Sequence, residues 1–240
     1  MTAPAPDGAA ILAAVRATWP PSDLVRSGPF DLPAETEGSR RATSARLRPG
    51  EGATVEDVAR VEAARPGTVF GTRDGAEDAL ADLLRARGYV EGGVSDLMAG
   101  PVAPLLGPLP PVTGFVHWPP LAACAALWDA HGNPAARRRP MLRSPGPKAV
   151  ILLRHADRAA GALFVACHAG LAVLHMVLTL PSARRQGVGL VGLRHAAAWA
   201  AEQGAAHLAL PVEADNAPAV ALYRRAGLAR RGGYRYWSAR

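Results

Sequence analysis

A short run at residues 184–189 has the composition of a site for a phosphate group. It reads Arg184-Arg185-Gln186-Gly187-Val188-Gly189, and it lies between a strand-like stretch and a stretch with helical periodicity. Glycine has no Cβ atom, so its backbone N–H group can approach an anion closely. The helix that follows would add unpaired N–H groups and the positive end of its dipole. We therefore expect a phosphate-binding loop, to which the two arginines add charge.

With Gly192 the same run spells G-x-G-x-x-G, the fingerprint of dinucleotide-binding folds. Those folds place the glycines directly after their first strand and continue with several parallel strands. Here three strand-like runs precede the glycines, and 48 residues follow Gly192. The acidic residue expected about 20 positions onward is replaced by His207. These features exclude the dinucleotide reading.

A second motif lies about 30 residues further along the chain. Residues 216–228 read NAPAVALYRRAGL, with Asn216 at an N-cap position and Gly227 where a helix would end. Taken together, in this order and at this spacing, the two motifs resemble those of the GNAT superfamily of N-acetyltransferases. The first family motif, Q/R-x-x-G-x-G/A, and the second, N-x-x-A-x-x-L-Y-x-x-x-G, are matched by Arg184, Gly187, Gly189, Asn216, Ala219, Leu222, Tyr223 and Gly227.

The resemblance covers roughly residues 141–240 and implies acetyl-CoA as the co-substrate and an amine as the acceptor. By position in the family motifs, Leu178, Thr179 and Leu180 would expose backbone groups to the pantetheine arm. The backbone N–H groups from Arg185 to Gly189, including those of Gln186 and Val188, would surround the pyrophosphate. The family more often has valine at the position of Thr179, which backbone binding tolerates.

Two side chains are candidates for proton transfer during the attack of a neutral amine on a thioester. Tyr223 matches the family position of the group that protonates the leaving thiolate, and Asn216 would lie near the acyl end. The carboxylate base of some family members aligns with the apolar Val173. In a regular strand His175 would lie on the same face, so we expect it to be the base, with a buried core histidine as the alternative.

The periodicity of the chain predicts a mixed α/β (α+β) fold with a largely antiparallel sheet flanked by helices. Three β-rich runs, at residues 148–154, 160–167 and 171–180, are joined by loops short enough only for antiparallel neighbours. A helix at 188–203, a strand at 207–212, a helix at 218–225 and a strand at 234–237 follow.

Residues 1–100 predict a smaller α/β unit, residues 101–120 a proline-rich linker, and residues 121–240 the acetyltransferase domain. In the first unit, helices are predicted at 9–18, 55–64 and 76–87, and weak strands at 30–33, 42–47 and 68–72. The order of these elements suits a trimmed copy of the same fold that has lost its phosphate loop. An unrelated accessory unit suits it as well.

The composition limits the remaining function classes. Residues 181–240 contribute +6 of the net charge of +7, with nine Arg against three carboxylates. Among these nine arginines only Arg224 and Arg235 adjoin an aromatic residue, and we do not expect a nucleic-acid partner. Two cysteines are too few for a metal cluster, and no run of 18 apolar residues predicts a membrane span. We expect a cytoplasmic, metal-free N-acetyltransferase, or alternatively a non-catalytic acyl-CoA-binding or regulatory module. The acceptor and the oligomeric state, a homodimer included, stay open.

Overall fold

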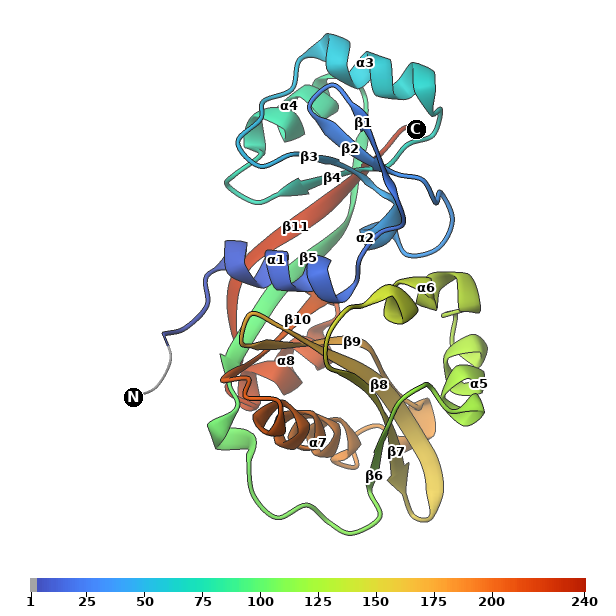
Figure 1. The fold of residues 1–240 in the computed structure, drawn as a ribbon, viewed down its shortest axis with the longest axis vertical. Coiled ribbons are helices and arrows are strands. Elements are labelled where there is room, and N and C mark those ends of the chain that lie inside the picture. Colours follow the sequence, from blue (N-terminus) through green and yellow to red (C-terminus); the bar gives the residue numbers. More distant parts are fainter. Residues whose placement is uncertain (1–3) are drawn as a thin grey trace.

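The computed structural model describes residues 4–240, and its strands join into one sheet of 11 strands (Figure 1). The strand order is β1-β2-β3-β4-β11-β5-β10-β9-β8-β7-β6. The strands are β1 (Leu24–Ser27), β2 (Phe30–Pro33), β3 (Ala45–Leu47), β4 (Phe70–Arg73), β5 (Val90–Pro101), β6 (Gly114–His117), β7 (Lys148–His155), β8 (Arg158–His168), β9 (Leu171–Thr179), β10 (His207–Glu213) and β11 (Ala229–Ser238). The predicted mixed, largely antiparallel sheet is confirmed, since only β3–β4 and β9–β10 pair in parallel.

Helices cover both faces of the C-terminal part of the sheet. The helices are α1 (Gly8–Thr18), α2 (Arg40–Thr43), α3 (Val55–Ala64), α4 (Asp78–Ala86), α5 (Ala122–Ala130), α6 (Ala135–Arg143), α7 (Val188–Glu202) and α8 (Ala217–Arg225). Two short 3-10 turns are η1 (Ala103–Leu105) and η2 (Pro181–Ala183). One face of β8–β10 shares a core with α7 and α8. The opposite face packs against α1, α5 and α6, so each strand there is covered on both sides.

The two halves of the chain repeat the same series of elements. The first half runs β1-β2-β3, α3, β4, α4 and β5, and the second runs β7-β8-β9, α7, β10, α8 and β11. In each half the third strand pairs in parallel with the fourth. From one edge the sheet runs β1-β2-β3-β4-β11, and from the other edge, after the extra strand β6, it runs β7-β8-β9-β10-β5. Equivalent strands of the two halves therefore occupy equivalent positions, counted from opposite edges. This arrangement has the topology of an approximate two-fold repeat.

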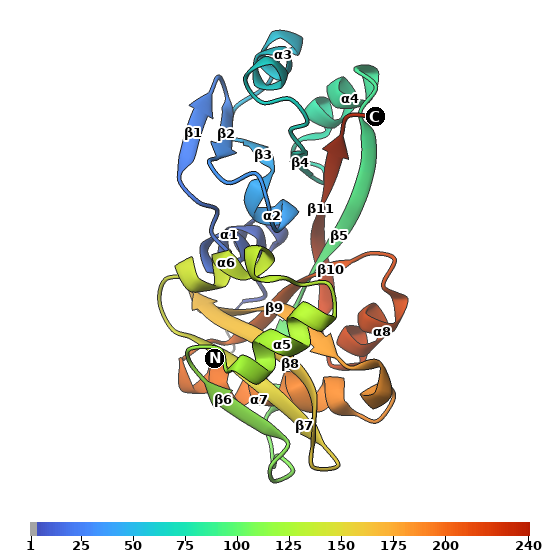
Figure 2. The ribbon, with the colours of Figure 1, turned by 90° about the vertical axis from the view of Figure 1, so that its right-hand side faces the viewer.

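The halves are joined because each sends its last strand into the middle of the sheet. Strand β5 of the first half lies between β10 and β11, and β11 of the second half lies between β5 and β4. The two long strands also pair with each other from Ala229↔Ala99 to Ser238↔Val90. Figure 2 shows β5 and β11 running side by side from the lower half into the upper one.

Strand β9 contains a bulge that changes which side chains share a face. Ala162 pairs with Leu178 and Phe164 with His175, so β9 has one extra residue at this point, and Met176 has a φ of 53°. Beyond the bulge Val177 packs with the α7 side, whereas Met176 and Leu178 pack with the α5 side. Regular alternation, which would put Val173, His175, Val177 and Thr179 on one face of the predicted strand, is therefore wrong beyond His175, because the bulge reverses it.

Other differences lie in the predicted linker and in short elements. Residues 114–117, inside the predicted 101–120 linker, form β6 at the edge of the sheet, where prolines are tolerated around a strand. Residues 42 and 43, expected to begin the strand at 42–47, instead end helix α2. Helix α6 contains Arg137 and Pro140 and was not predicted, because an internal proline normally argues against a helix.

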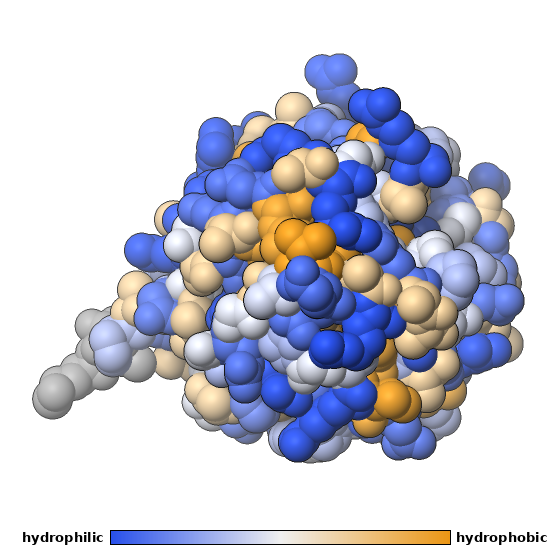
Figure 3. All heavy atoms as spheres, turned by 90° about the horizontal axis from the view of Figure 1, so that it is seen from above, coloured by the Kyte–Doolittle hydropathy of each residue, from blue (hydrophilic) through white to orange (hydrophobic). Residues whose placement is uncertain are grey.

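The surface of the N-terminal half is mainly hydrophilic when the molecule is seen from above, with hydrophobic residues gathered in one small area (Figure 3). The large exposed apolar residues of this half are Leu24, Val25, Val55 and Val90. A few such residues are normal for a protein surface. None of the helices within residues 4–240 combines the length and the apolar character needed to cross a bilayer.

The exchange of β5 and β11 predicts that the halves depend on each other for stability. A fragment of residues 1–100 lacks β11, so both β4 and β5 would expose an unpaired edge and lose the core contact of Trp237. We expect this fragment to be unfolded by circular dichroism, and the full chain to unfold in one transition by calorimetry and by tryptophan fluorescence. Two separate transitions, or a folded fragment, would show that the halves are independent domains.

Candidate active site

The glycine-rich loop leads directly into the N-terminus of α7. Gly187 is the N-cap of this helix and has a left-handed φ of 80°, and Arg185 before it has a φ of 63°. Within residues 4–240, the backbone N–H groups from Arg185 to Leu190 donate to no acceptor. A run of unpaired amides at the positive end of a 15-residue helix suits an anion.

The space around this loop is consistent with a bound phosphate group. A Cβ atom added at Gly187 would meet nothing within 4 Å, whereas at Gly189 it would lie 2.7 Å from Leu222 Cδ2 of α8. Gly187 is therefore required by its backbone conformation, and Gly189 by the close approach of α8. Arg184, Arg185 and Gln186 are exposed. Gln186 Nε2 donates to the Ser182 oxygen at 2.8 Å, which ties the loop to the preceding turn.

The end of β9 presents an unpaired backbone edge beside this loop. Strands β9 and β10 pair only from Leu171↔His207 to Val173↔Ala209 and then separate. We call this separation the strand split. Leu178, Thr179 and Leu180 lie beyond it, are half-buried, and remain attached to β8 on their other side, where the Leu180 N–H donates to the Ala160 oxygen at 2.9 Å. A backbone edge of this kind can bind an extended chain.

Helix α8 places the second motif on the same side of the sheet. Asn216 caps α8 by accepting a hydrogen bond from the Ala219 N–H at 3.3 Å, so its side-chain oxygen already has a structural role. Tyr223 is buried in the core shared with α7, and burial raises its pKa to about 12. Its hydroxyl makes no hydrogen bond within the described residues. At neutral pH it is a protonated phenol that is available as a donor.

His175 lies on the opposite face of the sheet, in a closed network. Its Nε2 is 2.9 Å from Thr18 Oγ1, and its Nδ1 is 2.7 Å from an Arg41 nitrogen. Its ring stacks on Trp19 with centroids 4.8 Å apart. Because a guanidinium only donates, Nδ1 must accept, and the proton of the neutral ring is on Nε2. Burial, with the charge of Arg41, holds the pKa of His175 well below 6.5.

These contacts bear directly on the expected role of His175. A general base needs a free lone pair directed toward the substrate, but the lone pair of this ring is taken by Arg41. The assignment of His175 as the base stays a prediction, and its geometry matches the alternative of a core histidine. The structure thus brings Tyr223 and the loop residues together on the α7 side, and separates His175 from them.

A polar pocket of about 370 Å³ lies between the halves, on the same face as His175. Its walls come from α2, β5, α6, β10 and β11. On β10, Leu208, Leu210 and Val212 face α7 while Ala209 faces α1, so by alternation the lining residues Pro211 and Glu213 face α1. The pocket therefore opens beside the strand split, on the face opposite to the phosphate loop.

The sequence did not predict that several residues at this pocket and at the bulge would contribute to a site. Arg41, Arg137, Glu213 and Tyr234 line the pocket, yet they come from four elements with no common motif. Trp128 of α5 donates its indole N–H to the oxygen of Met176 at 2.9 Å, which fixes the bulge from the α5 side. The only sequence signal for these residues was the presence of Trp128 and the arginine run at 137–139.

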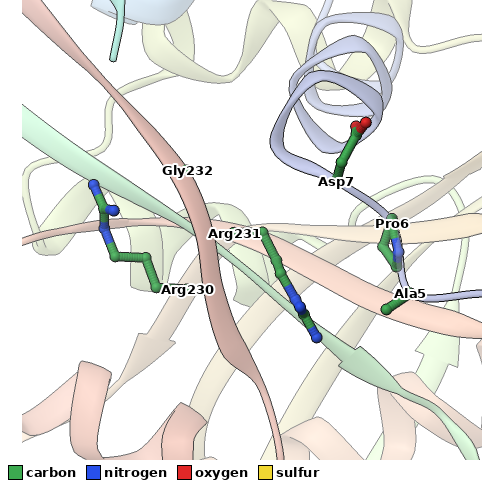
Figure 4. A pocket seen from close by; sticks show the side chains of 6 residues that line it. All are labelled: Ala5, Pro6, Asp7, Arg230, Arg231 and Gly232. Carbon is green, nitrogen blue, oxygen red and sulfur yellow. The ribbon is translucent and has the colours of Figure 1, made fainter. Parts of the chain in front are cut away.

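A second hollow, of about 480 Å³, lies between the segment before α1 and β11. Figure 4 shows that the carboxylate of Asp7 turns toward α1, where it caps the helix by accepting from the Ala10 N–H at 2.8 Å. Arg230 points to the other side of β11 and pairs with Asp74 and Asp96. Asp7 and Arg230 are thus engaged, and Arg231 is the remaining charged residue in the wall of this hollow, which offers less chemistry than the pocket between the halves.

Comparison with known proteins agrees with this geometry. Residues 120–228, slightly less than half of the chain, match the model of the Acetyltransferase (GNAT) family. The match to this family therefore lies in the C-terminal half and includes the glycine-rich loop and α8. A streptothricin acetyltransferase from Streptomyces lavendulae is 53% identical over 49 residues, which are 20% of this chain and 26% of that protein. The alignment thus spans about a quarter of the length of this curated relative.

Solved structures match almost the whole chain in fold. A GCN5-related N-acetyltransferase from Kribbella flavida superposes with a TM-score of 0.69 at 22% identity, covering 95% of this chain and 94% of that one. A tandem GNAT protein from the clavulanic acid biosynthesis pathway gives a TM-score of 0.60 at 16% identity, covering 90% and 81%. At these identities the similarity shows a common fold.

The left-handed conformation of Gly187 provides a matched test of the phosphate loop. Gly187 and Gly204, at the two ends of α7, have φ values of 80° and 75° and open space at Cβ. Gly187→Val and Gly204→Val should each cost at least about 1–2 kcal/mol of stability. Only Gly187→Val should weaken acetyl-CoA binding, by about tenfold or more, measured by calorimetry below the melting temperature of both variants. Equal binding by the two variants would contradict a phosphate site at this loop.

The network of His175 gives a prediction about stability and pH. His175→Ala removes a buried ring and should lower the free energy of unfolding by about 3 kcal/mol, with little loss of kcat per folded molecule. Because the folded pKa lies below 6.5, the unfolded chain binds more protons below that pH. This stability is present above about pH 6.5 and is lost as the pH falls toward the folded pKa.

Thermal unfolding of the wild type and His175→Ala between pH 5 and 8 measures this difference, with the exposed His155→Ala as the control. The loss of stability on acidification should be smaller in His175→Ala than in the other two proteins. A stable His175→Ala variant with a strongly reduced rate would instead support His175 as the base.

Proposed function

We propose that this protein is an N-acetyltransferase that moves an acetyl group from acetyl-CoA to an amine. The observation that carries the proposal is the run of unpaired amides at the start of α7, next to the unpaired edge of β9. The first feature suits a pyrophosphate and the second an extended pantetheine arm. A family domain at residues 120–228 supports the same activity.

The residues of the loop would bind the phosphates of the co-substrate. Backbone N–H groups from Arg185 to Leu190 would each donate to phosphate oxygens, and such charge-assisted hydrogen bonds are stronger than neutral ones. Arg184 and Arg185 are exposed beside the same group, and Arg184 Nε donates to the Thr179 backbone oxygen at 3.4 Å. Leu178, Thr179 and Leu180 would hold the pantetheine arm by backbone hydrogen bonds at the strand split.

Tyr223 would supply the proton that the leaving thiolate needs. The neutral amine forms the new C–N bond as the C–S bond breaks, and the thiolate takes a proton from the Tyr223 hydroxyl. Burial keeps this phenol protonated, since its pKa is raised to about 12. The proton that the amine releases would pass through water and return to the Tyr223 phenolate, because the lone pair of His175 is occupied. The net products are an N-acetyl compound and free CoA.

The N-terminal half would be a trimmed copy of the fold without a co-substrate site. Its helix α3 corresponds to α7, but Thr54 and Asp57 close its N-terminus with a capping box. The Asp57 N–H donates to Thr54 Oγ1 at 3.3 Å, and Glu56 and Asp57 add negative charge in the first turn. Phosphate would be repelled at this helix end, so each chain would bind one acetyl-CoA.

Replacement of Tyr223 separates binding from turnover. Tyr223→Phe removes the proton donor but keeps the buried ring, so kcat should fall by about 100-fold or more. The affinity for acetyl-CoA should change little, because the hydroxyl acts mainly as the bond breaks. Thiol release, followed with a thiol reagent against a panel of amines, measures kcat, and calorimetry measures binding. An unchanged kcat would leave Tyr223 with a packing role.

The same assay tests the proposed function itself. Acetyl-CoA binding without thiol release for any amine would indicate a non-catalytic acyl-CoA-binding module. The Gly187→Val variant should release thiol more slowly at low acetyl-CoA concentrations, because its affinity for the co-substrate is weakened.

A further inference from the structure

The pocket between the halves is rich in positive charge. Arg40, Arg41 and Arg137 line it, and Glu213 is the one acidic residue in its wall. Within residues 4–240, none of these three arginines forms an ion pair with a carboxylate. Other arginine side chains in the same half engage carboxylates, as Arg73 does with Glu77 at 2.7 Å and Arg87 with Glu62. The described residues therefore leave three neighbouring guanidinium groups of this pocket without a carboxylate partner.

Further charge lies behind the lining residues. Arg46 donates to the backbone oxygen of Arg41 at 3.0 Å. Arg16 is largely buried, and burial, together with the charge of Arg46, lowers its pKa to about 10. Burial alone would raise the pKa of Tyr234 in the pocket wall, but the charges of Arg41 and Arg46 and the Ser95 hydrogen bond bring it below its ordinary value. These effects report a positive potential in the pocket.

Arg41 is held in a defined position that leaves part of its guanidinium unused. One terminal nitrogen donates to His175 Nδ1 at 2.7 Å, and the guanidinium lies 5.8 Å from the centroid of Trp19. Its Nε is buried and has no hydrogen-bond partner among the described residues. Thr18 fixes the other side of the His175 ring at 2.9 Å. His175 is thus a positioning residue for Arg41.

The pocket also lies in a suitable position for the acceptor. If the co-substrate binds on the α7 face of the strand split, the acceptor must approach the split from the α1 face, where the pocket lies. Pro211 and Glu213 of β10 line the pocket, and Arg41 in its wall contacts His175 on β9, so the pocket lies next to the strand split. An amine in the pocket would face the split from the side opposite to the phosphate loop. Glu213 is exposed at the pocket wall and could attract the ammonium form of the amine. The volume of about 370 Å³ lies in the range of small-molecule sites.

We propose that the acceptor is a small amine that also carries an anionic group, and that Arg41 and Arg137 bind this group in the pocket between the halves. The anionic group is a carboxylate or a phosphate, both of which match the fork of a guanidinium. This inference rests on the proposed function. It assigns acceptor recognition to a pocket in which α2 of the N-terminal half supplies Arg41 and α6 of the C-terminal half supplies Arg137.

The test uses pairs of amines that differ only in the anionic group: 4-aminobutyrate against butylamine, lysine against 1,5-diaminopentane, and phosphoethanolamine against ethylamine. We expect kcat/KM to be at least tenfold higher for one or more of the anionic members. Arg41→Gln and Arg137→Gln should raise the KM of that acceptor about tenfold without changing the KM of acetyl-CoA. Arg139→Gln is the matched control, since Arg139 lies on the same helix as Arg137 and its nearest carboxylate is that of Glu35, at 3.6 Å.

Binding of anions alone separates this inference from the proposed function. Glutarate and inorganic phosphate are titrated by calorimetry into the protein saturated with CoA, and the preferred anion indicates the acceptor class. Anion binding that is weakened by Arg137→Gln and Arg41→Gln, but not by Arg139→Gln, supports the anion site. If the anions bind in this way and no amine is acetylated, the proposed function fails while the anion site stands. Equal rates for both members of every pair, or anion binding unaffected by either variant, would overturn the inference.

Discussion

The antiparallel pairing of β5 with β11 is the interaction on which the rest of the structure depends. Each half of the chain contributes one of these strands, and each strand also pairs with a strand of the opposite half. Backbone hydrogen bonds across the middle of a sheet allow little relative movement of the two sides. The pocket between the halves is therefore a fixed feature of one sheet, with walls from both halves of the chain. Its arginines are held at a constant distance from the strand split.

The bulge in β9 and the strand split divide the proposed chemistry between the two faces of the sheet. Before the bulge, Val173 and His175 face α1, and after it Val177 turns toward α7. The split at Val173 leaves the end of β9 without a neighbour on one side. A phosphate loop and Tyr223 lie on the α7 face, while the arginine pocket lies on the α1 face. An opening in the sheet between two such surfaces suits a reaction between two substrates that enter from opposite sides.

The repeated topology of the halves is matched by an opposite electrostatic character at their equivalent helices. Helix α7 begins with a left-handed glycine after two arginines, whereas α3 begins with a capping box and two acidic residues. An unpaired helix N-terminus can bind an anion, but a capped and acidic one cannot. In this interpretation the N-terminal half has lost a phosphate site and has gained the role of a wall, in which Arg41 of α2 is the main polar group.

The sequence by itself determined the local features, because these depend on residues that are close together in the chain. The helix cap at Thr54, the glycine loop before α7, the capped helix α8 and the mixed sheet could all be read from periodicity and motifs. Only the tertiary structure decided that His175 faces away from the glycine loop, since one extra residue after His175 turns Val177 toward α7 and leaves His175 facing α1. It also decided the exchange of β5 and β11 and the gathering of unpaired arginines between the halves. Such contacts join residues more than 90 positions apart, as Arg41 and Arg137 do, and no pattern along the chain encodes a distance through space.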